Sequence, residues 1–158
     1  MKPVTIKITS IIPMTSPEIC KEIINTERWS EFKGYSILPG IKSARFEVKP
    51  PGLIGSRIAV QNNDGSSHVE EIIEWDTINR VSLRFQEFDS ALQNLATHFV
   101  ETWEFRNVPG GTETSRIMTM YPKGVLGWLI LLPISRLMKR AFEENLRQIN
   151  NASSFAKT

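Results

Sequence analysis

The sequence predicts an α+β fold in which a curved antiparallel sheet of seven strands wraps around a long C-terminal helix, with two short helices after the first strand. Three observations predict it. Apolar and polar residues alternate in seven segments, turn-forming clusters separate most of these segments, and apolar residues near the C-terminus recur at helical spacing. Strands joined by such short connections pair with antiparallel neighbours.

The first strand and both short helices are predicted within the first 32 residues. Residues 4–11 alternate apolar with polar side chains, which is typical of a strand with one buried face. Ser-Pro-Glu at 16–18 then provides a capping hydroxyl and a proline suited to the first helical position, and Ile19 and Ile23 follow at helical spacing. A second helical turn is predicted over residues 26–32.

The remaining six strands are predicted between residues 37 and 121. Clusters of Gly, Pro, Asn and Asp mark turns at 50–52, 63–65, 76–79 and 109–111. The predicted strands are 41–48, 55–62, 67–75, 80–88, 97–107 and 112–121.

The last predicted element is an amphipathic helix. Its apolar face consists of Ile134, Leu137, Met138, Ala141, Phe142, Leu146 and Ile149. On the charged face, Lys139 with Glu143 and Arg140 with Glu144 have the spacing of weak ion pairs, and Pro133 is expected to kink or start the regular helix. We expect this helix to cover the apolar face of the sheet, since no other predicted element is long enough.

Several motifs together resemble a known superfamily. They are Ser-Pro-Glu at 16–18, Trp29 with Phe32, Gly-Ser at 55–56, Trp-Glu-Phe at 103–105, Gly-Gly-Thr at 110–112 and Pro-Lys-Gly at 122–124. In their order and spacing they resemble the START-like superfamily, also called SRPBCC, which includes the birch-pollen-allergen fold, lipid-transfer domains and polyketide cyclases. The resemblance implies a helix-grip fold with a cavity between sheet and long helix. It implies no common catalytic motif. Because no linker or repeat divides the chain, residues 1–158 are expected to form one such domain.

Composition excludes several classes of protein. The net charge is only +2 and both signs are spread along the chain, which argues against a nucleic-acid binder. Cys20 is the one cysteine, and residues 1–12 lack the apolar run of a signal peptide, so we expect a cytoplasmic protein without a disulfide. It is expected to be a monomer or a weak homodimer. The apolar stretch 124–134 is too short to span a bilayer as a helix.

Strand alternation predicts a largely aromatic pocket for a hydrophobic small molecule such as a lipid, a sterol or an aromatic polyketide-like compound. Val69, Ile73 and Val81 are also expected to face inward, and the same residues could instead simply fill the core. The residues predicted to line the pocket or its mouth are Trp75, Leu83, Phe85, Phe99, Trp103, Phe105, Met118, Met120, Trp128 and Leu132.

The same alternation predicts a polar spot inside the pocket. Glu101 lies between Phe99 and Trp103 in the strand, and Arg116 on the next strand is its expected partner, so the pair could fix a ligand hydroxyl or carbonyl. A one-residue bulge would instead turn both side chains into water. Asn145 falls in the apolar arc of the last helix, where it faces the pocket or bonds a buried backbone group.

The sequence contains few groups of residues that could catalyse a reaction or bind a metal. Glu101, with Glu71 and Tyr121, is a candidate for acid–base catalysis of the kind found in cyclases and dehydratases. His68 and His98 are expected to point away from the pocket, and neither a metal nor a cofactor is expected because no ligand cluster or phosphate loop is present. The sequence therefore favours a binding protein over a cofactor-independent cyclase or dehydratase.

The stretch 124–134 supports a third alternative, a protein-interaction module without a ligand. Because this stretch is apolar on every side, it is expected to be buried, to gate the cavity, to pair with another chain or to contact a membrane surface transiently. Arg136, Lys139 and Arg140 follow it and would favour anionic lipid headgroups.

Overall fold

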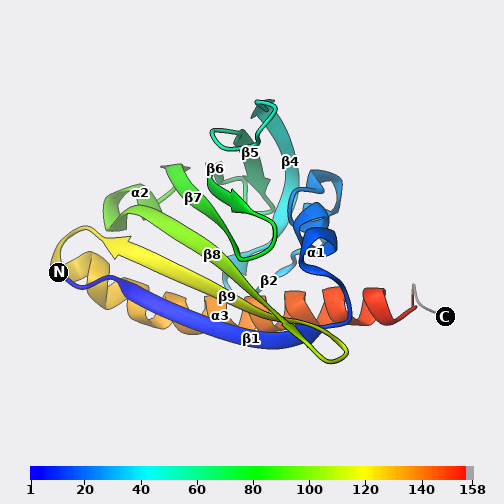
Figure 1. The fold of residues 1–158 in the computed structure, drawn as a ribbon. Helices are drawn as coiled ribbons and strands as arrows, with labels where there is room; N and C mark the ends of the chain where they lie inside the picture. Colours follow the sequence, from blue (N-terminus) through cyan, green and yellow to red (C-terminus); the bar gives the residue numbers. More distant parts are fainter. Residues whose placement is uncertain (156–158) are drawn as a thin grey trace.

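The seven predicted strands form one antiparallel sheet, and a long C-terminal helix packs along it (Figure 1). This computed structural model describes residues 1–155. The sheet order is β1-β9-β8-β7-β6-β5-β4. From β4 to β9, each strand pairs with the next strand of the sheet along the chain, and β1 pairs with the last strand, β9. The strands are β1 (Val4–Ile12), β4 (Ile41–Val48), β5 (Arg57–Asn62), β6 (Ser67–Asp76), β7 (Arg80–Asp89), β8 (Ala96–Val108) and β9 (Gly111–Pro122).

Two short helical segments follow β1, as the sequence predicts. They are α1 (Ser16–Ile23) and the 3-10 helix η1 (Thr26–Glu31). The cap of α1 is Thr15 rather than Ser16: the Thr15 hydroxyl accepts from the Glu18 N–H at 3.4 Å, and the Glu18 carboxylate accepts from the Thr15 N–H at 2.7 Å. This reciprocal pair is a capping box, and it places Pro17 one position later than expected, within the first helical turn where its missing N–H is tolerated.

Strand register brings three rows of residues onto the face that α3 (Gly124–Phe155) covers. Because the side-chain period of a strand is two, residues aligned across the sheet share a face. From β6 to β9 the rows are Glu70, Phe85, Phe99 and Met120; Ile72, Leu83, Glu101 and Met118; and Trp75, Val81, Trp103 and Arg116.

The inward face of β6 differs from the prediction. Val69 and Ile73 were expected to face inward, whereas His68 and Glu70 do so in the structure. The register between β6 and β7 shifts between Ile72 and Glu74. Such a bulge inserts one residue and reverses the alternation, so Trp75 returns to the inner face. Since apolar residues occur at both parities of this strand, alternation alone could not select the correct one.

The C-terminal helix starts earlier than predicted. α3 begins at Gly124, and Pro133 lies inside it rather than at its start. A Cβ on Gly127 would lie 2.2 Å from the Leu95 carbonyl oxygen, so a side chain there would prevent the contact between α3 and α2 (Leu92–Leu95).

Neither α2 nor the small hairpin of β2 (Gly34–Tyr35) and β3 (Leu38–Pro39) is predicted, because elements of this length have no detectable period. No helix within residues 1–155 combines the length and apolar character needed to cross a bilayer.

Candidate functional site

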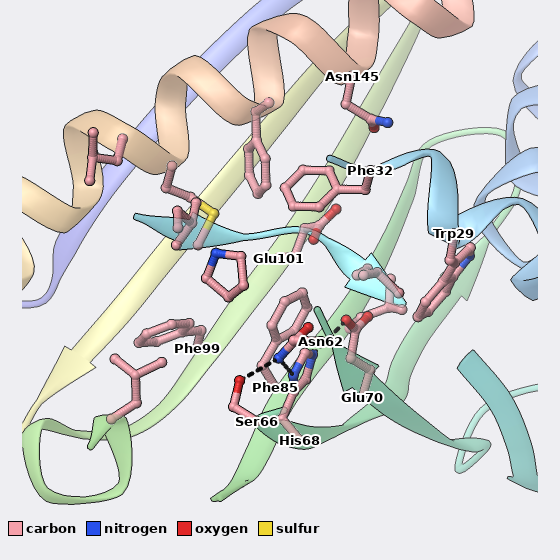
Figure 2. Close-up of a pocket in the computed structure, with 18 of the residues that line it drawn as sticks. Trp29, Phe32, Asn62, Ser66, His68, Glu70, Phe85, Phe99, Glu101 and Asn145 are labelled. Carbon is pink, nitrogen blue, oxygen red and sulfur yellow. Dashed lines mark hydrogen bonds and ion pairs between the residues drawn. The ribbon is translucent and has the colours of Figure 1, made fainter. Parts of the chain in front are cut away.

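A cavity of about 480 Å³ lies between the inner face of the sheet, the η1 segment and α3 (Figure 2). Its walls are mainly apolar: β7 and β8 contribute Leu83, Phe85 and Phe99, and α3 contributes Met138 and Phe142. Phe32, directly after η1, packs edge-on against Phe142 with 6.3 Å between ring centroids. A volume of this size is within the range of small-molecule binding pockets.

A buried ion pair forms the first polar group of the cavity. The Arg116 Nε donates to Glu101 Oε1 at 2.7 Å, and the Trp103 indole N–H donates to the same oxygen at 2.5 Å. Arg116 Nη1 also donates to the side-chain oxygen of Asn145 at 2.9 Å. The predicted pairing of Glu101 with Arg116 is therefore present, and Asn145 faces the cavity from α3 rather than bonding the backbone.

Aromatic rings surround the Arg116 guanidinium. Its central carbon lies 3.7 Å from the Phe142 ring centroid and 4.6 Å from the Trp103 ring centroid. A cation desolvated over aromatic faces is attracted by their quadrupoles. These contacts and the Glu101 carboxylate together hold the guanidinium in one place, with Nη2 and Glu101 Oε2 making no hydrogen bond to another of the described residues. The pair can thus offer one donor and one acceptor to a ligand.

The second polar group consists of His68 and Glu70 on β6. His68 Nε2 lies 3.0 Å from Glu70 Oε1, while its Nδ1 lies 3.4 Å from the Asn62 side-chain nitrogen. The imidazole stacks on Phe85 with 5.3 Å between centroids, and both His68 and Glu70 face the cavity (Figure 2). Burial raises the pKa of the Glu70 carboxyl above its ordinary value, although its bond to His68 opposes this shift.

The raised pKa of Glu70 predicts a specific pH dependence of stability. Between 4.5, its ordinary pKa, and the higher pKa of the folded state, the folded chain keeps a proton that the unfolded chain has lost. The free energy of unfolding therefore contains a contribution from Glu70 that is fully present below about pH 4.5. That contribution is lost as pH rises through the pKa of the folded state, by at most about 1.4 kcal/mol per pH unit.

Glutamine does not titrate, so we expect Glu70→Gln to lack this pH-dependent loss of stability. The free energy of unfolding of the variant, taken relative to that of wild type, should therefore increase as pH rises. Denaturant titrations at several pH values measure the difference. The exposed Glu27→Gln is the control. Parallel pH profiles for wild type and Glu70→Gln would contradict the prediction.

The structure brings only some of the predicted pocket residues to the cavity. Those that line it are Leu83, Phe85, Phe99, Glu101, Trp103 and Arg116. Phe105, Met118 and Met120 are buried in the core instead, and Trp75 and Trp128 are half-buried against it. Leu132 is exposed on the outer side of α3. None of these last six residues lines the cavity wall.

The other catalytic candidates lie outside the cavity as well. Glu71 accepts a hydrogen bond from Gln86, and Tyr121 is exposed and stacks on His98 with 4.3 Å between ring centroids. The expectation that His68 points away from the pocket is wrong, and sequence reasoning also missed Glu70. His68 and Glu70 are two residues apart in a strand, so they lie on the same face of it. This spacing was the one feature of the sequence that could have indicated the pair. Among residues 1–155, no three His, Cys, Asp or Glu side chains are grouped as metal ligands would be.

Comparison with known proteins identifies both family and fold. The family model described as polyketide cyclase / dehydrase and lipid transport matches residues 9–153. No curated protein matches the chain.

Several solved structures have the same fold. The protein TTHA0849 from Thermus thermophilus is 18% identical with a TM-score of 0.70, covering 98% of this chain and 100% of its own. A START superfamily protein from Mycobacterium smegmatis is 11% identical with a TM-score of 0.62, and the match covers 92% of this chain and 98% of that protein. The di-domain ARO/CYC protein BexL of the BE-7585A biosynthetic pathway is 19% identical with a TM-score of 0.60, covering 96% of this chain and 48% of its own. At these identities the likeness demonstrates the helix-grip fold.

Proposed function

The chain belongs to the polyketide cyclase / dehydrase and lipid transport family, and on that premise we propose that its cavity binds a mostly apolar small molecule with polar groups. The observation that carries the proposal is an apolar cavity of about 480 Å³ with two separate polar groups on its wall. Apolar walls supply most of the binding free energy, while a few placed polar groups orient the ligand.

The two polar groups differ in the ligand atoms they suit. Arg116 and Glu101 are neutral as a pair and present a donor beside an acceptor, which suits a hydroxyl or a carbonyl. Glu70, held by His68, accepts a hydrogen bond when ionised and donates one when protonated. A ligand with oxygen atoms at two separated positions, such as an oxygenated lipid or an aromatic polyketide-like compound, satisfies both. A plain hydrocarbon would leave both groups without a partner at a cost in affinity.

We expect the purified protein to bind one equivalent of the fluorescent probe anilinonaphthalene sulfonate, because the cavity is apolar and is of ligand size. In Leu137→Trp the indole fills part of the cavity, so the affinity for the probe should fall roughly tenfold or more. Ile78→Trp places the same group on an exposed turn and is the matched control. Fluorescence titration measures affinity, and circular dichroism checks that each variant is folded.

Equal probe affinity in Leu137→Trp and wild type would contradict binding in the cavity. Native mass spectrometry of the wild-type protein addresses the natural ligand. A co-purifying compound that is present in Ile78→Trp and lost in Leu137→Trp would support the proposal and reveal the ligand's mass.

Acid–base catalysis is a second candidate function, favoured by the arrangement of Glu70 and His68. A carboxyl whose pKa burial raises, next to an imidazole in an apolar cavity, places a proton donor and a proton acceptor side by side, as a cofactor-independent cyclisation or dehydration requires. Should a bound compound be converted by wild type and bound unchanged by Glu70→Gln, catalysis would be supported. Conversion at equal rates by both proteins would eliminate Glu70 as the catalytic group.

A further inference from the structure

The first turns of α3 carry an exposed apolar surface that the ligand cavity does not use. Val125, Leu126, Leu129 and Leu132 are 63%, 67%, 52% and 37% exposed, and none of them lines the cavity. On the opposite side of the same turns, Gly127 and Leu131 are buried. A side chain at Gly127 would meet the Leu95 backbone, so this side of α3 packs closely against α2. Rotating α3 to bury the exposed leucines would break that contact.

The same face of α3 becomes cationic in the following turns. Residues 125, 129, 132, 136 and 139 follow one another at steps of four and three, so Arg136 and Lys139 extend the apolar row, with Arg140 beside them. All three basic side chains are exposed. We define this docking face as Val125, Leu126, Leu129, Leu132, Arg136, Lys139 and Arg140.

No acidic residue balances these cations locally. The chain contains no Asp or Glu between Glu113 and Glu143. The expected ion pairs of Lys139 with Glu143 and Arg140 with Glu144 are not formed, and Glu144 pairs with Arg147 instead. Among the described residues, Arg136, Lys139 and Arg140 have no salt-bridge partner.

We propose that this docking face binds the surface of an anionic phospholipid bilayer. A helix of this kind lies in the membrane interface, with its leucines among the acyl chains and its cations at the headgroups. Charge argues against a second copy of the chain as the occupant. In a twofold antiparallel pairing of the apolar rows, the three cations of each copy would approach the positively polarised N-terminus of the other copy's α3, and the chain has no acidic residue between Glu113 and Glu143 to offset them. The inference does not depend on the ligand proposal.

Flotation with lipid vesicles tests this proposal directly. Wild type should bind vesicles of phosphatidylcholine with one quarter phosphatidylglycerol, and should bind phosphatidylcholine alone far more weakly. In the triple variant Arg136→Gln, Lys139→Gln, Arg140→Gln, partitioning into anionic vesicles should fall by about a hundredfold, at roughly fivefold per cation. In Leu126→Gln, Leu129→Gln it should fall roughly tenfold or more, because less apolar surface enters the interface.

Matched controls separate the docking face from charge and hydrophobicity in general. Lys7→Gln, Lys21→Gln, Lys42→Gln removes the same charge from exposed sites elsewhere, and Ile11→Gln, Ile78→Gln removes exposed apolar side chains elsewhere. Both should retain wild-type binding within about twofold. Equal loss in control and docking-face variants would overturn the proposal, as would an absence of wild-type binding to anionic vesicles. A wild-type dimer that dissociates in Leu126→Gln, Leu129→Gln without any vesicle binding would assign the face to self-association instead.

Discussion

Arg116→Met is expected to lower the free energy of unfolding by about 3–5 kcal/mol, because it leaves the buried Glu101 carboxylate without its cation. The methionine preserves much of the apolar stem, so the loss reports the charge rather than the volume. Asn145 also loses its donor, which adds to the effect. Urea denaturation followed by tryptophan fluorescence measures the change.

A double variant identifies the cause of that destabilisation. In Glu101→Gln, Arg116→Met the uncompensated charge is gone while the amide oxygen still accepts from Trp103, so most of the lost stability should return. The exposed ion pair of Arg106 with Glu113 provides the surface control, and Arg106→Met should cost less than about 1 kcal/mol. If Arg116→Met behaves like Arg106→Met, the buried pair does not have the energetic role we assign to it.

Phe142→Ala should also destabilise the fold strongly, by about 3–5 kcal/mol. The Phe142 side chain is only 2% exposed, and its ring contacts both Phe32 and the Arg116 guanidinium. Truncation removes these contacts, and α3 is held in place by the sheet and cannot collapse into the space. The free energy of unfolding from urea titration again measures the effect.

Leu126→Ala, on an exposed turn of the same helix, is the matched control for Phe142→Ala and should change stability by less than about 0.5 kcal/mol. Alanine has a helix propensity close to that of the leucine it replaces, so the comparison isolates burial. A loss under about 1 kcal/mol in Phe142→Ala would mean that the sheet and α3 repack around the vacated volume, and would contradict a fixed cavity wall.

Much of the fold and one part of the site could be predicted from local pattern. Alternation and turn residues located the seven strands, since the inner and outer faces of a strand differ in polarity and short turns enforce antiparallel neighbours. In β8 and β9 the same alternation placed Glu101 and Arg116 on one face. The 3.6-residue period of the last helix placed Asn145 on its apolar side.

The tertiary structure decided the rest of the cavity. A bulge in β6 set which parity faces inward and so brought His68 and Glu70 into the wall, because one inserted residue reverses every side chain beyond it. The contact of Asn145 with Arg116 joins a helix to a strand, and sequence spacing does not encode that approach. The sequence by itself thus determined the elements and their apolar faces, while register and packing between distant segments decided which polar groups meet inside.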